Sequence, residues 1–178
     1  MHYRARSVAG RLPLPVCRSA SWSHIVKNIF SWAALLVAMP ALAQNSALTV
    51  QVDGQLPPLV RIYKKIHAAP ELSHHEENTS ALLAGELRSS GYTVWDHVGK
   101  YPNGRWPGYG VVAVLKNGKG PTVLVRADMD ALPVEEQTGL PYASHVRAAD
   151  DSGTEVPVMH ACGHDIHVTV LIGTARML

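Results

Sequence analysis

Thr122-Val-Leu-Val-Arg-Ala-Asp-Met-Asp-Ala-Leu-Pro133 joins an almost wholly apolar run to a pair of carboxylates. An apolar run of this length is typical of a strand that is buried on both faces of a sheet. Asp128 and Asp130 follow directly, and side chains at the carboxyl ends of strands in α/β folds point into the crevice where ligands bind. We therefore expect a central strand whose end presents two carboxylates. Taken alone, the Asp-x-Asp pair favours a solvated loop that ends at Pro133, and the His/Cys cluster that follows about 30 residues later reverses this preference.

Two helices are predicted before this strand. Apolar residues recur at helical spacing from Leu56 to His67, directly behind Pro57-Pro58, with a polar and flexible lead-in over residues 44–55. Ser73-His-His-Glu76 has the pattern of a capping box, which predicts a second helix from Ser73 to Ser90. Gly91 then serves as the stop signal of that helix.

The apolar period changes to two after Gly91, which indicates strands. They are predicted at 92–95 and 110–115, and the hairpin turn signal at 117–120 leads into the strand at 122–125. Residues 134–157 are predicted to be a long polar connection, and the apolar run 168–178 a buried helix. The order of helices and strands indicates an α/β domain with a mixed sheet.

The densest group of reactive side chains is Met159-His-Ala-Cys-Gly-His-Asp-Ile-His167. A thiolate and an imidazole two positions apart suit one borderline-soft divalent metal, or two adjacent ones, so Cys162 and His164 are the best ligand candidates. The carboxylate that accepts the second N–H of His164 is either Asp130 or Asp165. His160 and His167 flank the pair, and they and Asp128 are possible supporting residues.

Other interpretations of this cluster are a core cysteine beside surface histidines, and a catalytic Cys–His dyad. The dyad is disfavoured because a nucleophile and its base are usually distant in sequence and meet through the fold. Among the scattered histidines we expect surface or capping roles. His67 is the least ordinary of them, because it closes a helix beside a proline turn.

The N-terminus predicts export. Residues 1–27 hold five of the 16 basic residues and no acidic one, an apolar core follows at 29–38, and Ala41-Leu-Ala43 fits a cleavage site. This arrangement is typical of a secretory signal peptide over residues 1–43, with a signal anchor or a buried helix as the alternative. After cleavage, 11 basic and 14 acidic residues give a net charge of −3, so no basic surface for nucleic acid is expected. We expect a periplasmic or secreted protein, with no membrane attachment once the signal is removed.

Three segments in order, His67-Ala-Ala-Pro-Glu-Leu-Ser73, Arg126–Pro133 and Met159–His167, resemble the amidohydrolase branch of the aminoacylase/carboxypeptidase metallopeptidase family. That branch includes hippurate hydrolases, N-acyl-amino-acid amidohydrolases and auxin-conjugate hydrolases. The resemblance covers residues 56–178. Two departures are His67-Ala-Ala, where members usually have His-x-His, and Ile166, where they usually have Gly.

The resemblance implies a hydrolase with two divalent ions, zinc or manganese, that cleaves the amide bond of N-acyl amino acids or small amide conjugates. Cys162 and His164 match metal ligands of the family, and Asp130 matches a residue that supports the centre. The family's general-base Glu would lie beyond Leu178. We therefore expect residues 56–178 to be the N-terminal portion of a zinc-peptidase-like catalytic domain, truncated before a dimerisation domain. The longer protein is expected to be a homodimer, and this fragment to be inactive alone. The alternative is a non-catalytic metal- or peptide-binding relative that lacks the base.

Overall fold

The computed structural model describes residues 47–102 and 104–178, which form three helices and two small antiparallel sheets. A helix over residues 47–68 comes first, followed by α2 (Glu77–Ser89) and, at the end of the chain, α3 (His164–Met177). One sheet pairs β1 (Thr93–Val98) with β2 (Gly110–Val114), and the other pairs β3 (Arg147–Ala149) with β4 (Glu155–Pro157). The predicted α/β class is confirmed. The proposed signal peptide lies outside the described residues.

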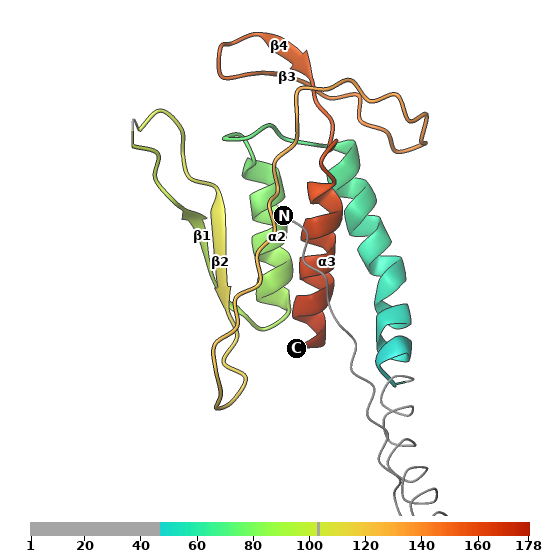
Figure 1. Cartoon of the computed structure of the whole chain (residues 1–178), viewed down its shortest axis with the longest axis vertical. Coiled ribbons are helices and arrows are strands. Elements are labelled where there is room, and N and C mark those ends of the chain that lie inside the picture. Colours follow the sequence, from blue (N-terminus) through green and yellow to red (C-terminus); the bar gives the residue numbers. More distant parts are fainter. Residues whose placement is uncertain (1–46, 103) are drawn as a thin grey trace, which may run out of the picture. The chain divides into compact units, whose positions relative to one another are not determined.

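The main core lies between the three helices and one face of the β1–β2 pair (Figure 1). Its buried members are Ile66, Leu83, Leu87, Val168, Ile172 and Ala175. The antiparallel register sets Val94 opposite Ala113, and both side chains pack against this core. Gly173 lets α3 approach the first helix, since a Cβ there would come within 2.8 Å of the Leu59 side chain. These contacts fix α3, whose first residue is the candidate ligand His164.

A second, smaller core holds together the loops that precede α3. Leu72, Ala131 and Val158 are its buried residues. Isolated bridges pair Leu72 with Ala131 and Leu132 with Met159, and the amides of Leu132 and Met159 exchange hydrogen bonds of 2.9 and 3.0 Å. Three distant segments thus run side by side, so residue 130 is brought close to residue 160.

The expected central strand at 122–125 is not formed among the described residues. Residues 121–130 are extended, but they pair with no strand, and the side chains of Val123 and Leu124 are 79% and 89% exposed. No hairpin forms at 117–120 either, because β2 pairs only with β1. Side chains still alternate between two sides over residues 127–130. Ala127 and Met129 pack against the main core, which leaves Asp128 and Asp130 on the other side.

The helix boundaries also differ from those predicted. The first helix begins by residue 47 and passes through Pro57-Pro58, so the expected flexible lead-in is wrong for residues 47–55. In addition, α3 begins at His164, four residues before the apolar run. The polar connection at 134–157 contains the β3–β4 hairpin, whose short strands carry no clear apolar alternation. No described helix has the length and apolar character needed to cross a membrane.

The N-terminus of α2 is capped by a residue other than the one predicted. The helix starts at Glu77, and its cap residue Glu76 makes no side-chain capping hydrogen bond. Instead, the carboxylate of Glu71 accepts the backbone N–H groups of Asn78 and Thr79, at 3.0 and 2.7 Å. The capping box at Ser73 is therefore wrong. The reason is that the turn after Leu72, closed by the hydrogen bond from the amide of His75 to the carbonyl of Leu72, brings the first helical turn of α2 within reach of the Glu71 side chain. The predicted stop is confirmed: Gly91 has a φ of 89°, and its amide bonds to the carbonyl of Arg88.

We expect Glu71→Ala to lower the free energy of unfolding by about 1 kcal/mol, because two helix amides lose their acceptor. The matched control is Ser73→Ala, which removes the side chain that the sequence pattern favours as the cap and should change stability little. Chemical denaturation of both variants measures the difference. A larger loss for Ser73→Ala than for Glu71→Ala would contradict the capping role of Glu71.

Candidate metal centre

Cys162 and His164 lie at the start of α3, where a tight turn leads into the helix. Gly163 adopts a left-handed conformation with a φ of 76°, and its amide donates to the carbonyl of His160 at 3.1 Å. Glycine adopts this conformation without the steric cost that a Cβ brings. Cys162 lies within the turn as an exposed free thiol, and His164 is the first residue of the helix.

His164 is oriented by the end of the extended segment 121–130. Its Nδ1 lies 2.9 Å from Oδ1 of Asp130 and 2.9 Å from the backbone carbonyl oxygen of the same residue. Two acceptors at Nδ1 require that this nitrogen carry the proton, which leaves Nε2 with a free lone pair in the neutral ring. A carboxylate behind an imidazole in this way fixes the tautomer of a metal-ligating histidine. Of the two carboxylates that the sequence left open as partners, the structure selects Asp130.

The remaining predicted residues fall into different positions. The ring of His167 lies 5.6 Å from that of His164, one turn along α3. Asp128 forms an exposed ion pair with Arg126 at 2.5 Å, so it does not take part in holding His164. Within the described residues, no three His, Cys, Asp or Glu side chains are gathered closely enough to hold a metal ion. Within residues 47–102 and 104–178, Cys162 and His164 therefore do not belong to a group of three such side chains.

His160 is the first residue of this turn and is only 4% exposed. Neither of its ring nitrogens has a hydrogen-bond partner among the described residues. Burial lowers the pKa of His160, so the ring is neutral near pH 7. A buried neutral imidazole without a partner, beside a thiol and an oriented imidazole, fits a centre that receives a further group.

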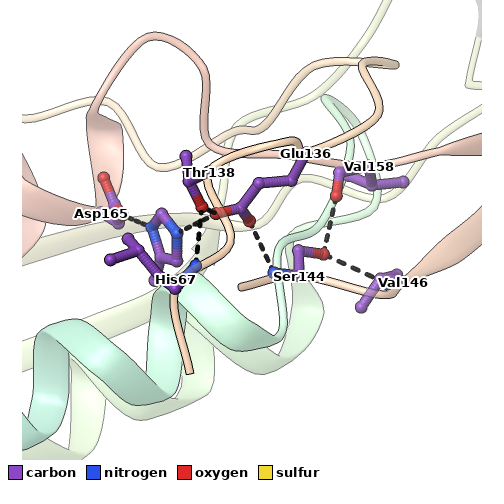
Figure 2. A network of polar contacts seen from close by, with 8 residues as sticks. His67, Glu136, Thr138, Ser144, Val146, Val158 and Asp165 are labelled. Atoms are coloured by element: carbon purple, nitrogen blue, oxygen red, sulfur yellow. Dashed lines mark hydrogen bonds and ion pairs between the residues drawn. The ribbon is translucent and has the colours of Figure 1, made fainter. Parts of the chain in front are cut away.

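Asp165 has a partner that the sequence did not predict. Its Oδ2 lies 2.6 Å from Nδ1 of His67, and the other ring nitrogen, Nε2, lies 3.0 Å from Oε1 of Glu136 (Figure 2). Asp165 is 1% exposed and His67 6% exposed. Asp165 therefore binds the end of the first helix instead of orienting His164. The signal for His67 was its position before a proline turn, but nothing in the sequence singled out Glu136.

Burial alone lowers the pKa of His67, but hydrogen bonds to Asp165 and Glu136, together with their charges, outweigh it and raise the pKa. Glu76 is a second buried group that sequence reasoning placed only in a helix cap. Burial raises the pKa of Glu76, and the nearby charge of Asp130 adds to that increase. Titratable side chains with shifted pKa values thus surround the turn that carries Cys162 and His164, as is common at functional sites.

Comparison with known proteins shows that this chain is similar to peptidases and amidohydrolases. Residues 124–178 match the sequence profile of Peptidase family M20/M25/M40. Thermostable carboxypeptidase 1 of Saccharolobus solfataricus is 46% identical over 121 residues, which are 67% of this chain and 27% of that protein. Hippurate hydrolase of Campylobacter jejuni is 42% identical over 119 residues, 66% of this chain and 27% of that protein.

A solved structure supports the same assignment. A dinuclear metal-binding peptidase of the M20 family from Bacillus subtilis, known from its crystal structure, has 35% sequence identity to this chain and superposes with a TM-score of 0.53. The similarity covers 68% of this chain and 30% of that one. Residues 124–178 thus carry the sequence profile of Peptidase family M20/M25/M40, and the described residues resemble part of a catalytic domain of that family. The resemblance expected from the sequence is confirmed, and the chain spans about a quarter of the length of the curated relatives it matches.

Proposed function

We propose that this chain supplies part of the metal centre of an amidohydrolase that acts on N-acyl amino acids or related small amide conjugates. The observation that carries the proposal is the Nδ1 of His164, held 2.9 Å from the Asp130 carboxylate, beside the exposed thiol of Cys162. In this proposal the Cys162 sulfur and the Nε2 of His164 face the same metal centre. A thiolate and a neutral imidazole suit zinc, and manganese is the second candidate that family membership favours.

Each residue has a distinct role in this proposal. Cys162 and His164 bind the metal, and Asp130 orients His164 and increases the basicity of its Nε2. A bound divalent ion lowers the pKa of water and polarises the carbonyl of an amide, which is the chemistry that amide hydrolysis requires. A centre of two ions is proposed because the Bacillus subtilis relative is described as dinuclear. His160 and His167 are close enough to support the centre, but neither is proposed as a ligand.

The substrate class is inferred from the relatives. Hippurate hydrolase, N-acetyl-L-cysteine deacetylase and a carboxypeptidase are among them, and each of these names refers to cleavage of an amide next to an amino acid. The described residues provide too few ligands for a complete centre, so we propose that the 178-residue chain is inactive alone. We also propose that the longer protein dimerises and that it is exported by the signal over residues 1–43. Export predicts that secreted material has a mass corresponding to cleavage after Ala43.

The first test concerns metal binding. Cys162→Ala and His164→Ala should each weaken zinc binding by more than about tenfold, because each removes a donor, and Asp130→Asn should weaken it by about 10- to 100-fold. Equilibrium dialysis with metal analysis measures the affinities. His145→Ala is the control, since His145 is exposed and lies outside the Met159–His167 cluster. Equal zinc binding by all five proteins, wild type included, would contradict the assignment of Cys162 and His164.

A second test concerns catalysis. With zinc or manganese added, the purified chain should release no glycine from benzoylglycine above the rate in buffer, because the described residues lack a complete centre. Chromatographic quantification of free glycine provides the measurement. The Cys162→Ala protein, purified in parallel, controls for contaminating hydrolases. Chelator-sensitive release by the wild-type chain that is absent from Cys162→Ala would show that the chain is active by itself.

A further inference from the structure

A buried ionic cluster lies next to the candidate metal centre and joins three separate segments. His67, at the end of the first helix, lies between Asp165 in the first turn of α3 and Glu136 in the loop before β3 (Figure 2). The side chains of these three residues are 7%, 2% and 0% exposed. Such deep burial makes each of these contacts expensive to break, because the remaining charge would be left without a partner.

The polar side-chain atoms of His67, Asp165 and Glu136 all have hydrogen-bond partners. Both ring nitrogens of His67 face carboxylate oxygens, so both donate and the ring is an imidazolium. The second oxygen of Asp165, Oδ1, accepts the backbone N–H of Ile166 at 2.8 Å. Glu136 accepts the hydroxyl of Thr138 and, at 2.6 Å, the backbone N–H of Ser144. A network that is satisfied in this way holds its members in one geometry.

The network is connected to both ends of the loop that carries Cys162, at Val158 and at Asp165. At the far end, Asp165 directly follows His164 in the sequence. At the near end, the hydroxyl of Ser144, whose amide is held by Glu136, donates to the carbonyl of Val158 at 2.7 Å. Residues 159–164 therefore lie between two points that are both tied to His67 (Figure 2).

Aromatic rings shield the cluster. The rings of Tyr63 and Tyr142 each lie 5.4 Å from that of His67, and Lys64 places its ammonium 4.9 Å from the centre of the Tyr142 ring. Burial and a hydrogen bond with Tyr142 raise the pKa of Tyr63 to about 12, so this hydroxyl remains protonated. The aromatic rings limit access of water, which strengthens the ionic contacts behind them.

We propose that His67, Glu136 and Asp165 are positioning residues, which fix the loop and the first turn of α3 so that Cys162 and His164 can bind one metal centre. The inference rests on the proposed function, because it assumes that these two residues bind metal. It adds a structural requirement at a distance: none of the three residues is a proposed ligand, yet their loss should weaken metal binding. Partners of this kind that orient ligands usually change metal affinity by about 10- to 100-fold when they are replaced.

The experiment uses Asp165→Asn and Glu136→Gln in the full 178-residue chain. Each substitution preserves shape and removes one charge that contacts His67. The readout is the zinc concentration that protects half of the Cys162 thiol from iodoacetamide, measured alongside the thermal unfolding midpoint. We expect this concentration to rise by about 10- to 100-fold in both variants.

Asp151→Asn is the matched control, since it removes a carboxylate that contacts His74 at 3.0 Å in a different part of the structure. It should leave the half-protecting zinc concentration within about twofold of wild type, in keeping with the small effect expected when a substitution lies away from the site. A comparable rise for Asp151→Asn would overturn the inference, because the effect would then be unspecific.

The remaining outcomes separate the inference from the proposed function. If zinc does not protect wild-type Cys162 at all, the proposed function fails, and the inference fails with it. If wild type is protected and both folded variants have an unchanged half-protecting concentration, the inference alone is overturned, whatever happens to their melting temperatures. If Asp165→Asn does not fold, Glu136→Gln decides the question, because Glu136 contacts His67 from the side away from α3. Loss of folding in both variants would show that the network is purely structural and would also overturn the inference.

Discussion

The candidate centre depends on the backbone pairing that brings residues 131–132 between residues 71–72 and residues 158–159. Leu72 pairs with Ala131 and Leu132 with Met159, and the buried side chains of this region form the smaller core. Without these bridges, Asp130 and His164, which are 34 positions apart, would have no reason to meet. Hydrogen bonds between extended segments fix the register strictly, since a slip of one residue would turn Asp130 to the opposite face.

Buried charge is the second constraint, and it operates next to the first. His67 lies between two carboxylates that are almost completely inaccessible to water. Such a cluster is costly to desolvate and is weak support for stability by itself. Its retention beside a loop with two potential metal ligands is consistent with a role in geometry, because paired charges and hydrogen bonds tolerate little displacement. The fold thus combines an apolar framework of three helices with a polar network at one end.

Much of the architecture follows from local sequence signals. The strands at β1 and β2 and the stop at Gly91 were predictable, because alternation and glycine conformation depend on residue type and short spacing. Cys162 and His164 are proposed as ligands on the same basis. The cap of α2 was wrongly predicted at Ser73, since only the course of the chain decides that the Glu71 carboxylate reaches the free amides of that terminus. The segment at 122–125 has the composition of a buried strand, yet composition cannot supply the neighbouring strand that would cover Val123 and Leu124.

The sequence by itself determined the α/β class and the family resemblance, and it supplied the proposed donor atoms, since each depends on which side chains occur and at what spacing. The tertiary structure decided which carboxylate serves which imidazole. Asp130 accepts the hydrogen bond from Nδ1 of His164. Asp165, which follows His164 directly in the chain, bonds to His67 instead. The physical reason is that adjacent residues at a helix start point in different directions, so proximity in sequence does not imply a shared hydrogen bond. Glu136 shows the same limit, because a glutamate in a polar loop gains its role only when the loop folds over His67.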